Sequence, residues 1–546
     1  MTTDTVVPPV LPFERTRHRR PVNKTRAVPR VLAGLPVAAV LVMQAILSLR
    51  LLHATTASGD EAIYIYSGHQ LIHGLWHGGG SPYYETWLSG APVIYPILAA
   101  MIDHIGGLIL VRLTSLAFML TATSLLYATA RRPFGYWPAV AAAGLFASLG
   151  LTQSLSVYAT YDAMALMLMA FAAYCAVRAA DSTRWMLAVP LVLFIANATK
   201  YATILFDPVV IGLAALMLRP EGWSRIRDRV IALCFATAVL DTAAVLLAGT
   251  AYWQGIKFTT VARTAGTGIL NLEPATTHSI ISYSWSVIGL VVCLGVIAVI
   301  TAPMFRERSY MWLLALLTVA GVLVTLEALH IHDLTSVNKH DDFGVWFTCI
   351  PAGYAFARGA ELDRAWWKRL VFIVPALASL ALVLHAYGAP VPAGSAYGGA
   401  RMFGPIASRL GASSPYRYLL GGRDSRVILY DYHLAVPWYR EFDDDYIKYP
   451  IPGRGGDESG AVRGLACQSF ARGCMYLEGP AAARAAIRAH WFAVVSFVGQ
   501  NYLPIDITEL DTVRTTPGYK LVSTVGGEPT YIYAPDYPRS LGGTRP

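Results

Sequence analysis

Long apolar runs separated by short basic segments constrain this chain more than any other feature of its sequence. Of its 546 residues, 55% are hydrophobic and only 14% are charged, whereas soluble domains carry about 25% charged residues. Many runs are close to the length of helix that crosses a hydrocarbon core of about 30 Å. The pattern predicts an α-helical polytopic membrane protein. The apolar segments lie at 31–52, 108–130, 137–152, 162–179, 185–199, 201–218, 230–250, 284–303, 310–329, 345–358 and 369–388.

The basic residues between these segments predict the orientation of the chain. Residues 1–30 are rich in arginine and proline, which predicts a disordered cytoplasmic tail before an uncleaved signal-anchor. With the N-terminus inside, the predicted internal loops all contain arginine, as loops that stay in the cytoplasm do. We therefore expect eleven spans in the cell membrane, with loop 53–107 and the C-terminal tail outside. The predicted internal loops are 131–136, 180–184, 219–229, 304–309 and 359–368.

The stretch 91–107 departs from the other apolar segments. Pro92, Pro96, Asp103 and His104 interrupt it, and counting it as a span would break the charge pattern that follows. We expect an interfacial helix on the outer surface, with a membrane-spanning segment as the alternative.

The tail after residue 388 differs in character from the apolar part. Its patterns predict a strand at 426–430, a short helix at 481–490 and a hairpin from 519–525 and 529–533. We expect 31–388 to form a transmembrane catalytic domain and 389–546 a small extracytoplasmic α/β domain. Cys467 and Cys474 are the only cysteines of the tail, and an external compartment permits a disulfide between them.

Charged residues beside the predicted spans gather on the predicted outer side. The acidic pair Asp60-Glu61 starts a predicted loop after the first span, and Asp162 opens the fourth. Lys200 lies in a tight external turn between two spans. The remaining members are Arg112 near the outer end of the second span, Lys257 and Arg263 in a long outer loop, and Lys339-His340-Asp341-Asp342 before the tenth span.

Such a set of charges suits transfer of a sugar from a lipid-linked phosphate, whose headgroup lies at the membrane surface. Cations would neutralise the phosphate leaving group, and a carboxylate would deprotonate the acceptor hydroxyl. No glycine-rich phosphate loop of the Walker type is present, so a nucleotide-driven pump is unsupported. No basic stripe is interleaved with aromatics, so we expect no nucleic-acid partner.

The motif Gly59-Asp60-Glu61-x-x-Tyr64 after the first span resembles the acidic motif of the GT-C glycosyltransferases. The resemblance is to the branch of protein mannosyltransferases and aminoarabinose transferases, and it covers about 31–390. It continues through Gly74, Ser81-Pro-Tyr83, Arg112, Tyr161-Asp162 and Lys200-Tyr201. It implies a polyprenyl-phosphate sugar as donor, within a lipid bilayer and without a cofactor.

The resemblance also implies roles for single residues. Asp60 would be the base, and Glu61 and Asp162 would position hydroxyl groups of acceptor or donor. Residues 338–344 depart from the Arg-Tyr-like start of a span that is common in this branch, which leaves the acceptor open between a protein, a lipid and a cell-wall glycan. The candidate ligands of the donor phosphate are Lys200, Arg263, Arg112 and His340.

Each of these residues also has a plain structural interpretation. Asp60 and Glu61 would be a solvated loop end, Asp162 would favour a helix N-terminus, and Lys200 would extend to the interface. Arg112 would likewise extend to the interface, and Arg263 and Lys257 would be ordinary surface charges. His330 and His332 have a spacing that is weak as a metal signal, so we expect no metal.

Two other functions compete with glycosyl transfer. A transporter or lipid flippase would be expected to have repeated halves and charges near mid-span, and neither is evident in the sequence. A non-enzymatic envelope-assembly factor would use the C-terminal tail as a binding module.

Overall fold

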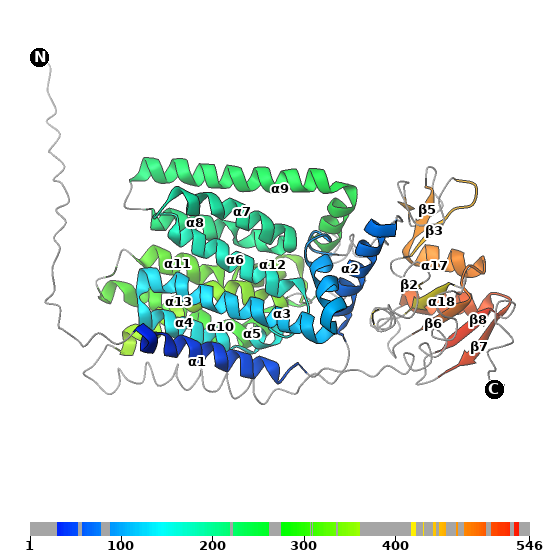
Figure 1. The fold of residues 1–546 in the computed structure, drawn as a ribbon, viewed down its shortest axis with the longest axis horizontal. Helices are drawn as coiled ribbons and strands as arrows, with labels where there is room; N and C mark the ends of the chain where they lie inside the picture. Colours follow the sequence, from blue (N-terminus) through cyan, green and yellow to red (C-terminus); the bar gives the residue numbers. More distant parts are fainter. Residues whose placement is uncertain are drawn as a thin grey trace, which may run out of the picture.

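The protein, described here from a computed structural model, consists of a large helical part and a smaller part that contains the strands (Figure 1). The helical part runs to residue 360 and the smaller part begins at residue 417. The residues that the structure describes are 30–52, 57–77, 88–218, 222–260, 275–305, 307, 310–334, 337–360, 417–421, 430, 441–443, 447–454, 466–467, 474–497, 504–524 and 529–533.

Most of the apolar runs predicted from the sequence are helices. Within the described residues, five helical segments are long and apolar enough to cross a membrane. This supports a multi-pass membrane protein, whereas the number of eleven spans stays a prediction, since segment 369–388 lies outside the described residues. The elements are α1 (Arg30–Leu49), α2 (Gly59–His77), α3 (Tyr95–Phe134), α4 (Tyr136–Ser148), α5 (Gly150–Leu155), α6 (Tyr161–Arg178), α7 (Thr183–Thr199), η2 (Tyr201–Phe206), α8 (Asp207–Met217), α9 (Trp223–Thr260), α10 (Thr277–Thr301), η5 (Ala302–Phe305), α11 (Met311–Ala320), α12 (Leu323–Ile331) and α13 (Val337–Ala360).

Helix α13 lies in the middle of the helical part and packs against α4, α10 and α11. Small residues allow this close packing, as is usual between membrane helices. A Cβ on Gly353 of α13 would lie only 2.4 Å from the backbone nitrogen of Ala142 on α4. The indole of Trp346, fully buried, donates a hydrogen bond of 3.0 Å to the carbonyl of Ala122 on α3. These contacts fix the position of α13 relative to α3 and α4.

The acidic pair begins a helix and not the predicted loop. Asp60 and Glu61 lie in the first turn of α2, where carboxylates stabilise the positive end of the helix. Ser58 and Glu61 form a capping box, because Ser58 N donates to Glu61 Oε2 at 2.7 Å and Glu61 N donates to Ser58 Oγ at 3.5 Å. Residues 62–66 are all buried, so the helix is held by tertiary packing as well as by its cap.

The stretch 91–107 contains a separate helical segment at the start of α3. Backbone angles at Gly106 (φ −145°, ψ 17°) and Gly107 (φ 65°, ψ −172°) break α3 into two pieces. The first piece starts at Tyr95 with a proline in its first turn. The kink lets the first piece take its own direction, as an interfacial helix requires, although its position in a membrane stays a prediction.

The smaller part contains two sheets and two helices. A five-stranded sheet has the order β2-β1-β6-β8-β7, in which β1 is parallel to β2 and β6, and β8 is antiparallel to β6 and β7. A three-stranded sheet has the order β3-β5-β4. The elements are β1 (Tyr418–Gly421), β2 (Glu441–Asp443), β3 (Lys448–Pro450), β4 (Ala466–Cys467), β5 (Tyr476–Glu478), α17 (Gly479–Arg488), β6 (Val494–Phe497), α18 (Pro504–Thr515), β7 (Tyr519–Ser523) and β8 (Thr530–Tyr533).

The helix predicted at 481–490 corresponds to α17, and the predicted hairpin corresponds to β7 and β8. Most of the predicted strand 426–430 lies outside the described residues. Cys474 is disulfide-bonded, and the four cysteines of the helical part are free. The side chain of Cys467, its predicted partner, lies outside the described residues.

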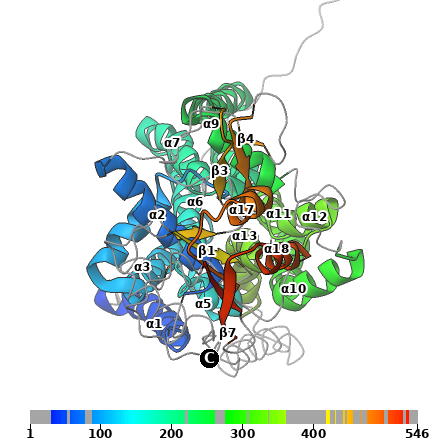
Figure 2. The same ribbon diagram turned by 90° about the vertical axis from the view of Figure 1, so that its right-hand side faces the viewer.

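The smaller part lies at one end of the helical part (Figures 1 and 2), where it contacts α2 and α3. Tyr430 donates a hydrogen bond of 2.7 Å to Asp103 Oδ1 on α3. The other oxygen of Asp103 lies 2.8 Å from His69 Nε2 on α2. Around these polar contacts, Tyr418 and Ile532 of the sheet share one apolar cluster with residues of both helices. The two parts of the chain are therefore joined beside the start of α2.

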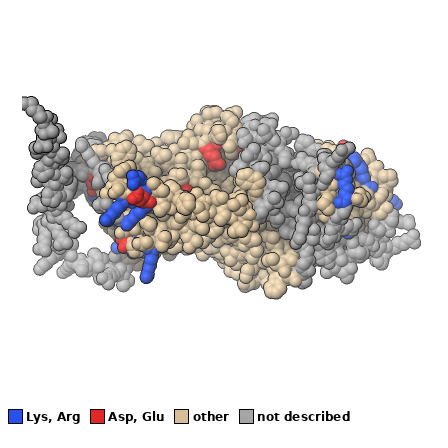
Figure 3. Space-filling model, turned by 90° about the horizontal axis from the view of Figure 1, so that it is seen from above, with Lys and Arg blue, Asp and Glu red and all other residues tan. Residues whose placement is uncertain are grey.

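Basic residues gather at the opposite end of the helical part (Figure 3). There Arg132 at the end of α3 and Arg178 at the end of α6 both pair with Asp181. Arg358 at the end of α13 pairs with Glu307. The predicted internal loops to which most of these residues belong thus lie together, although the orientation of this end in a membrane stays a prediction.

Candidate active site

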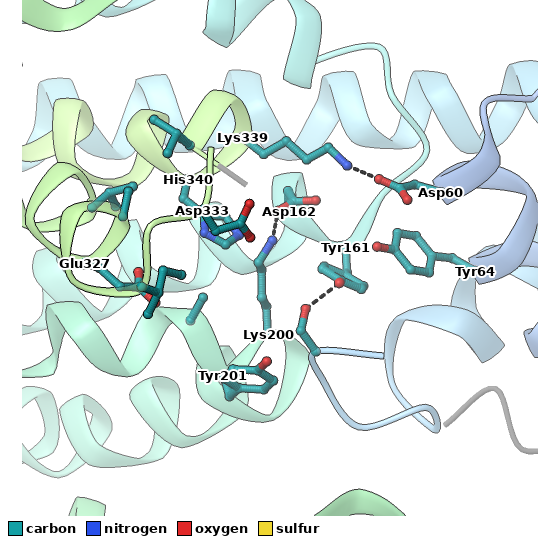
Figure 4. A pocket seen from close by; sticks show the side chains of 16 residues that line it. Asp60, Tyr64, Tyr161, Asp162, Lys200, Tyr201, Glu327, Asp333, Lys339 and His340 are labelled. Atoms are coloured by element: carbon teal, nitrogen blue, oxygen red, sulfur yellow. Dashed lines mark hydrogen bonds and ion pairs between the residues drawn. The ribbon is translucent and has the colours of Figure 1, made fainter. Parts of the chain in front are cut away.

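A pocket of about 120 Å³ lies at the end of the helical part where α2, α6, α12 and α13 begin or end (Figure 4). Segments far apart in the sequence contribute to its wall, and most of its polar side chains are charged or phenolic. The lining residues are Asp60, Tyr64, Ser89, Tyr161, Asp162, Lys200, Tyr201, Ala202, Val324, Glu327, Ala328, Ile331, Asp333, Val337, Lys339 and His340.

One ion pair in the pocket is buried. Lys200 binds Asp162, and their side chains are only 3% and 1% exposed. The Lys200 ammonium also lies 4.8 Å from the centre of the Tyr161 ring, within the range of a cation–π contact. Removing one partner of a buried ion pair costs about 3–5 kcal/mol, because the other charge is left unpaired. Asp162 therefore holds Lys200 firmly in the wall.

A second ion pair is open to solvent. Lys339 in the first turn of α13 binds Asp60 in the first turn of α2, and their side chains are 35% and 39% exposed (Figure 4). Ion pairs of this exposure contribute about 0–1 kcal/mol, since water competes for both charges. Asp60 and Lys339 can therefore separate easily, which distinguishes them from the buried pair.

The turn that carries Lys200 is fixed from both sides. Thr203 donates a hydrogen bond of 2.6 Å to Asn197 Oδ1, which closes the turn from within. The loop before α3 adds two backbone bonds across the turn, from Ala91 N to Ala198 O (2.6 Å) and from Tyr201 N to Ser89 O (2.8 Å). The sequence predicts a tight turn at this place, and the structure shows that residues 89–91 position it.

Aromatic rings form the wall of the pocket between the two ion pairs. The rings of Tyr64 and Tyr161 lie 4.3 Å apart, centre to centre. Tyr95 packs edge-on against both at 6.3 and 6.2 Å, and the Tyr161 hydroxyl shares a hydrogen bond with Ser89. Of these three rings, Tyr64 and Tyr161 line the pocket, and all three are largely buried.

Glu61 and Arg112 lie outside the pocket and bind each other. Arg112 donates to both oxygens of Glu61, at 2.8 and 2.7 Å, and both side chains are buried. Glu61 also accepts the backbone N–H of Ala159, just before α6, at 2.8 Å. The guanidinium is thus directed to a protein carboxylate and not toward the pocket, where the sequence analysis places a phosphate. This geometry favours a structural interpretation of both residues.

The remaining predicted residues divide into three cases. His340 lines the pocket and packs edge-on against Phe343, with ring centres 6.4 Å apart. Asp341 and Asp342 are buried beside it and do not line the pocket. Arg263 and the side chain of Lys257 lie outside the described residues.

Several residues of the pocket have no role predicted from the sequence. Lys339 was visible as the neighbour of His340, but its pairing with Asp60 joins residues 279 positions apart. Glu327 was visible as a charge inside the apolar run 310–329, and charged residues within spans are candidates for function. Within the described part of the chain, no three His, Cys, Asp or Glu residues are grouped as metal ligands.

One region of the chain is similar in sequence to a known protein family. Residues 91–248 match the family described as dolichyl-phosphate-mannose-protein mannosyltransferase. The matched region includes Arg112, Asp162 and Lys200. The sequence has no significant match among curated proteins.

Solved structures resemble the chain over a much longer range. ArnT from Cupriavidus metallidurans bound to undecaprenyl phosphate is 14% identical, with a TM-score of 0.58, over 95% of this chain and 100% of ArnT. Archaeal AglB from Archaeoglobus fulgidus, in complex with an inhibitory peptide and a dolichol-phosphate, is 12% identical with a TM-score of 0.53, over 84% of this chain and 69% of AglB.

The Archaeoglobus fulgidus oligosaccharyltransferase tethered with an acceptor peptide is 11% identical, with a TM-score of 0.50 over 74% of this chain. The chain spans 63% of the length of that oligosaccharyltransferase. At such identities the likeness concerns the fold. The sequence match over residues 91–248 and the fold shared over most of the chain confirm the predicted resemblance to the GT-C glycosyltransferases.

Proposed function

We propose that the protein is an integral-membrane glycosyltransferase that moves a sugar from a polyprenyl phosphate to an acceptor at the outer face of the cytoplasmic membrane. One observation supports this above all. The pocket combines a solvent-accessible carboxylate, Asp60, with two lysines at one end of a helical membrane domain. A lipid-linked donor has its phosphate at such a place, with its lipid tail in the bilayer beside it.

Asp60 is the proposed base. Its side chain lines the pocket and is 39% exposed, so an acceptor can reach it. The acceptor oxygen bonds to the anomeric carbon of the sugar, and its proton passes to Asp60. The bond from that carbon to the phosphate oxygen breaks, and its electron pair stays on the phosphate. Asp162 positions Lys200 through the buried ion pair.

Lys200 and His340 are the proposed ligands of the donor phosphate among the described residues, and Arg263 stays a proposed third. The negative charge on the phosphate grows as the glycosyl bond breaks, so a cation there stabilises the transition state more than the ground state. The undecaprenyl phosphate bound to ArnT and the dolichol-phosphate in complex with AglB support the same donor class. We propose no cofactor and no metal.

The acceptor is a protein, a lipid or a cell-wall glycan, and the topology is the one predicted from the basic loops. The acceptor peptide tethered to the Archaeoglobus fulgidus oligosaccharyltransferase supports a protein as one of these acceptor classes. In the proposed topology, eleven spans place residues 389–546 outside the cytoplasm. The comparisons do not favour a transporter, a flippase or a non-enzymatic assembly factor.

Turnover of synthetic polyprenyl-phosphate sugars by the purified protein tests the function. Asp60→Asn keeps the shape of the side chain and removes its basicity, so transfer should fall by about 10² or more. Asp181→Asn is a matched control, because Asp181 is also ion-paired and about as exposed, but at the opposite end of the helical part.

Asp181→Asn should therefore transfer sugar like the wild type. Wild-type turnover in folded Asp60→Asn would reject Asp60 as the base. No turnover by the wild type with any polyprenyl-phosphate sugar would reject the function itself. Mass spectrometry of envelope glycans and glycoproteins from a deletion strain then identifies the acceptor class.

A further inference from the structure

The two lysines of the pocket differ in how firmly each is held. Lys200 is buried on Asp162 and packed over the Tyr161 ring. Lys339 reaches Asp60 on a flexible four-carbon stem, and water has access to both partners. Lys339 can therefore move from Asp60 to another anion, because neither side chain would be left as a buried, unpaired charge.

The contact with Lys339 also occupies the carboxylate of Asp60, which an acceptor hydroxyl has to reach. A carboxylate beside a cation accepts a proton less readily than a free one, because the cation stabilises the ionised form. Asp60 must therefore lose this contact before it serves as a base. The donor phosphate brings a competing anion into the same pocket, with oxygens that accept strong charge-assisted hydrogen bonds.

We propose that Lys339 is a further ligand of the donor phosphate. In the protein without donor, Lys339 is bound to Asp60 instead. Binding of the donor moves the ammonium from the carboxylate to the phosphate, so that the base becomes free only when a sugar is in place. This inference rests on the proposed function. It adds an order of events, in which the donor precedes proton transfer from the acceptor.

The charges at the end of the reaction fit this exchange. The donor phosphate is a diester with one negative charge, and it leaves as a monoester that carries two. Asp60, meanwhile, has taken up the acceptor proton and no longer attracts Lys339. The lysine is therefore held on the phosphate until the polyprenyl phosphate departs and Asp60 releases its proton to water.

Binding of undecaprenyl phosphate to the purified full-length protein tests whether Lys339 contacts phosphate or only neutralises Asp60. The comparison is made in the Asp60→Asn background, where no carboxylate is left for Lys339 to neutralise. Adding Lys339→Met should weaken binding by about tenfold or more, the effect of one hydrogen bond to a charged group. Lys339→Arg in the same background should keep most of the affinity, because it retains the charge.

Undecaprenol is the matched probe, because it has the same lipid and no phosphate. All variants should bind it alike. Asp60→Asn alone should bind undecaprenyl phosphate more tightly than the wild type, because Lys339 no longer has to leave a carboxylate. Thermal unfolding verifies that each variant is folded, and Lys339→Gln replaces Lys339→Met if the latter is not.

Three results separate the possible failures. Equal affinity of Asp60→Asn and Asp60→Asn/Lys339→Met for undecaprenyl phosphate would overturn the role of Lys339 as a ligand. Weaker or unchanged binding by Asp60→Asn would overturn its exchange between the carboxylate and the phosphate. A wild-type protein that neither binds undecaprenyl phosphate nor turns over a donor would contradict the proposed function itself.

Discussion

At the scale of single residues, Asp60 and Glu61 differ through their surroundings and not through their chemistry. They are neighbours in the first turn of α2, where successive side chains point about 100° apart around the axis. Asp60 faces the pocket, whereas Glu61 is fully buried on Arg112. The motif that contains both thus combines a candidate base with a structural ion pair that anchors the same helix turn.

We expect Glu61→Gln to act on stability. Glutamine keeps the shape of the side chain but leaves the buried guanidinium of Arg112 without its counter-charge, which costs about 3–5 kcal/mol. The unfolding midpoint in detergent should fall, while turnover per folded molecule stays close to wild type. Asp60→Asn in the same turn is the control, with the opposite outcome of normal stability and lost turnover. If Glu61→Gln has normal stability but has lost turnover, Glu61 takes part in the reaction and its role is not structural.

At the scale of elements, the sequence predicts the helices better than their boundaries. Apolar runs of suitable length indicate most of the membrane helices, since burial in lipid requires that pattern. The start of α2 is a helix and not the predicted loop, and Ser58 and Glu61 have the spacing of a capping box. The two-glycine kink in α3 was also visible as Gly106-Gly107, but only backbone angles show where the direction changes.

The sequence predicts several residues of the candidate site but not the partners that they bind. Asp60, Asp162, Lys200 and His340 line the pocket as motif and topology suggest. The partner of each charge depends on how separate helices pack, which a single sequence does not encode in any local pattern. The pairing of Lys339 with Asp60 is an example, because α13 and α2 meet only in the folded protein.

The turn that carries Lys200 depends on the absence of a side chain at Gly90. A Cβ at this position would lie 1.9 Å from the carbonyl oxygen of Thr199. Gly90→Ala must therefore push the loop and the turn apart, with a cost of about 1–3 kcal/mol, as for other overpacked sites. Turnover should fall because Lys200 moves with the turn. Gly150→Ala is the control, since a Cβ there meets nothing within 4 Å. A Gly90→Ala protein with the stability and turnover of the wild type would refute this dependence.

At the scale of the whole molecule, the two ends of the helical part are chemically different. One end has the pocket, and beside it Tyr430 and Asp103 join the smaller part to α3. The other end has the ion pairs of Arg132 and Arg178 with Asp181. Because arginine-rich loops stay in the cytoplasm, this polarity predicts that the pocket and the smaller part face outward together.

Cysteine labelling tests the predicted orientation. In a variant without the four free cysteines, an impermeant maleimide added to intact cells should label Asp511→Cys in α18 but not Ser182→Cys between α6 and α7. Both positions are exposed, so both should react after the cells are permeabilised, which separates topology from burial. Labelling of Ser182→Cys alone in intact cells would show that the orientation is the reverse of the predicted one. The pocket would then face the cytoplasm. Because nucleotide sugars are available there, the location of the pocket would no longer favour a lipid-linked donor.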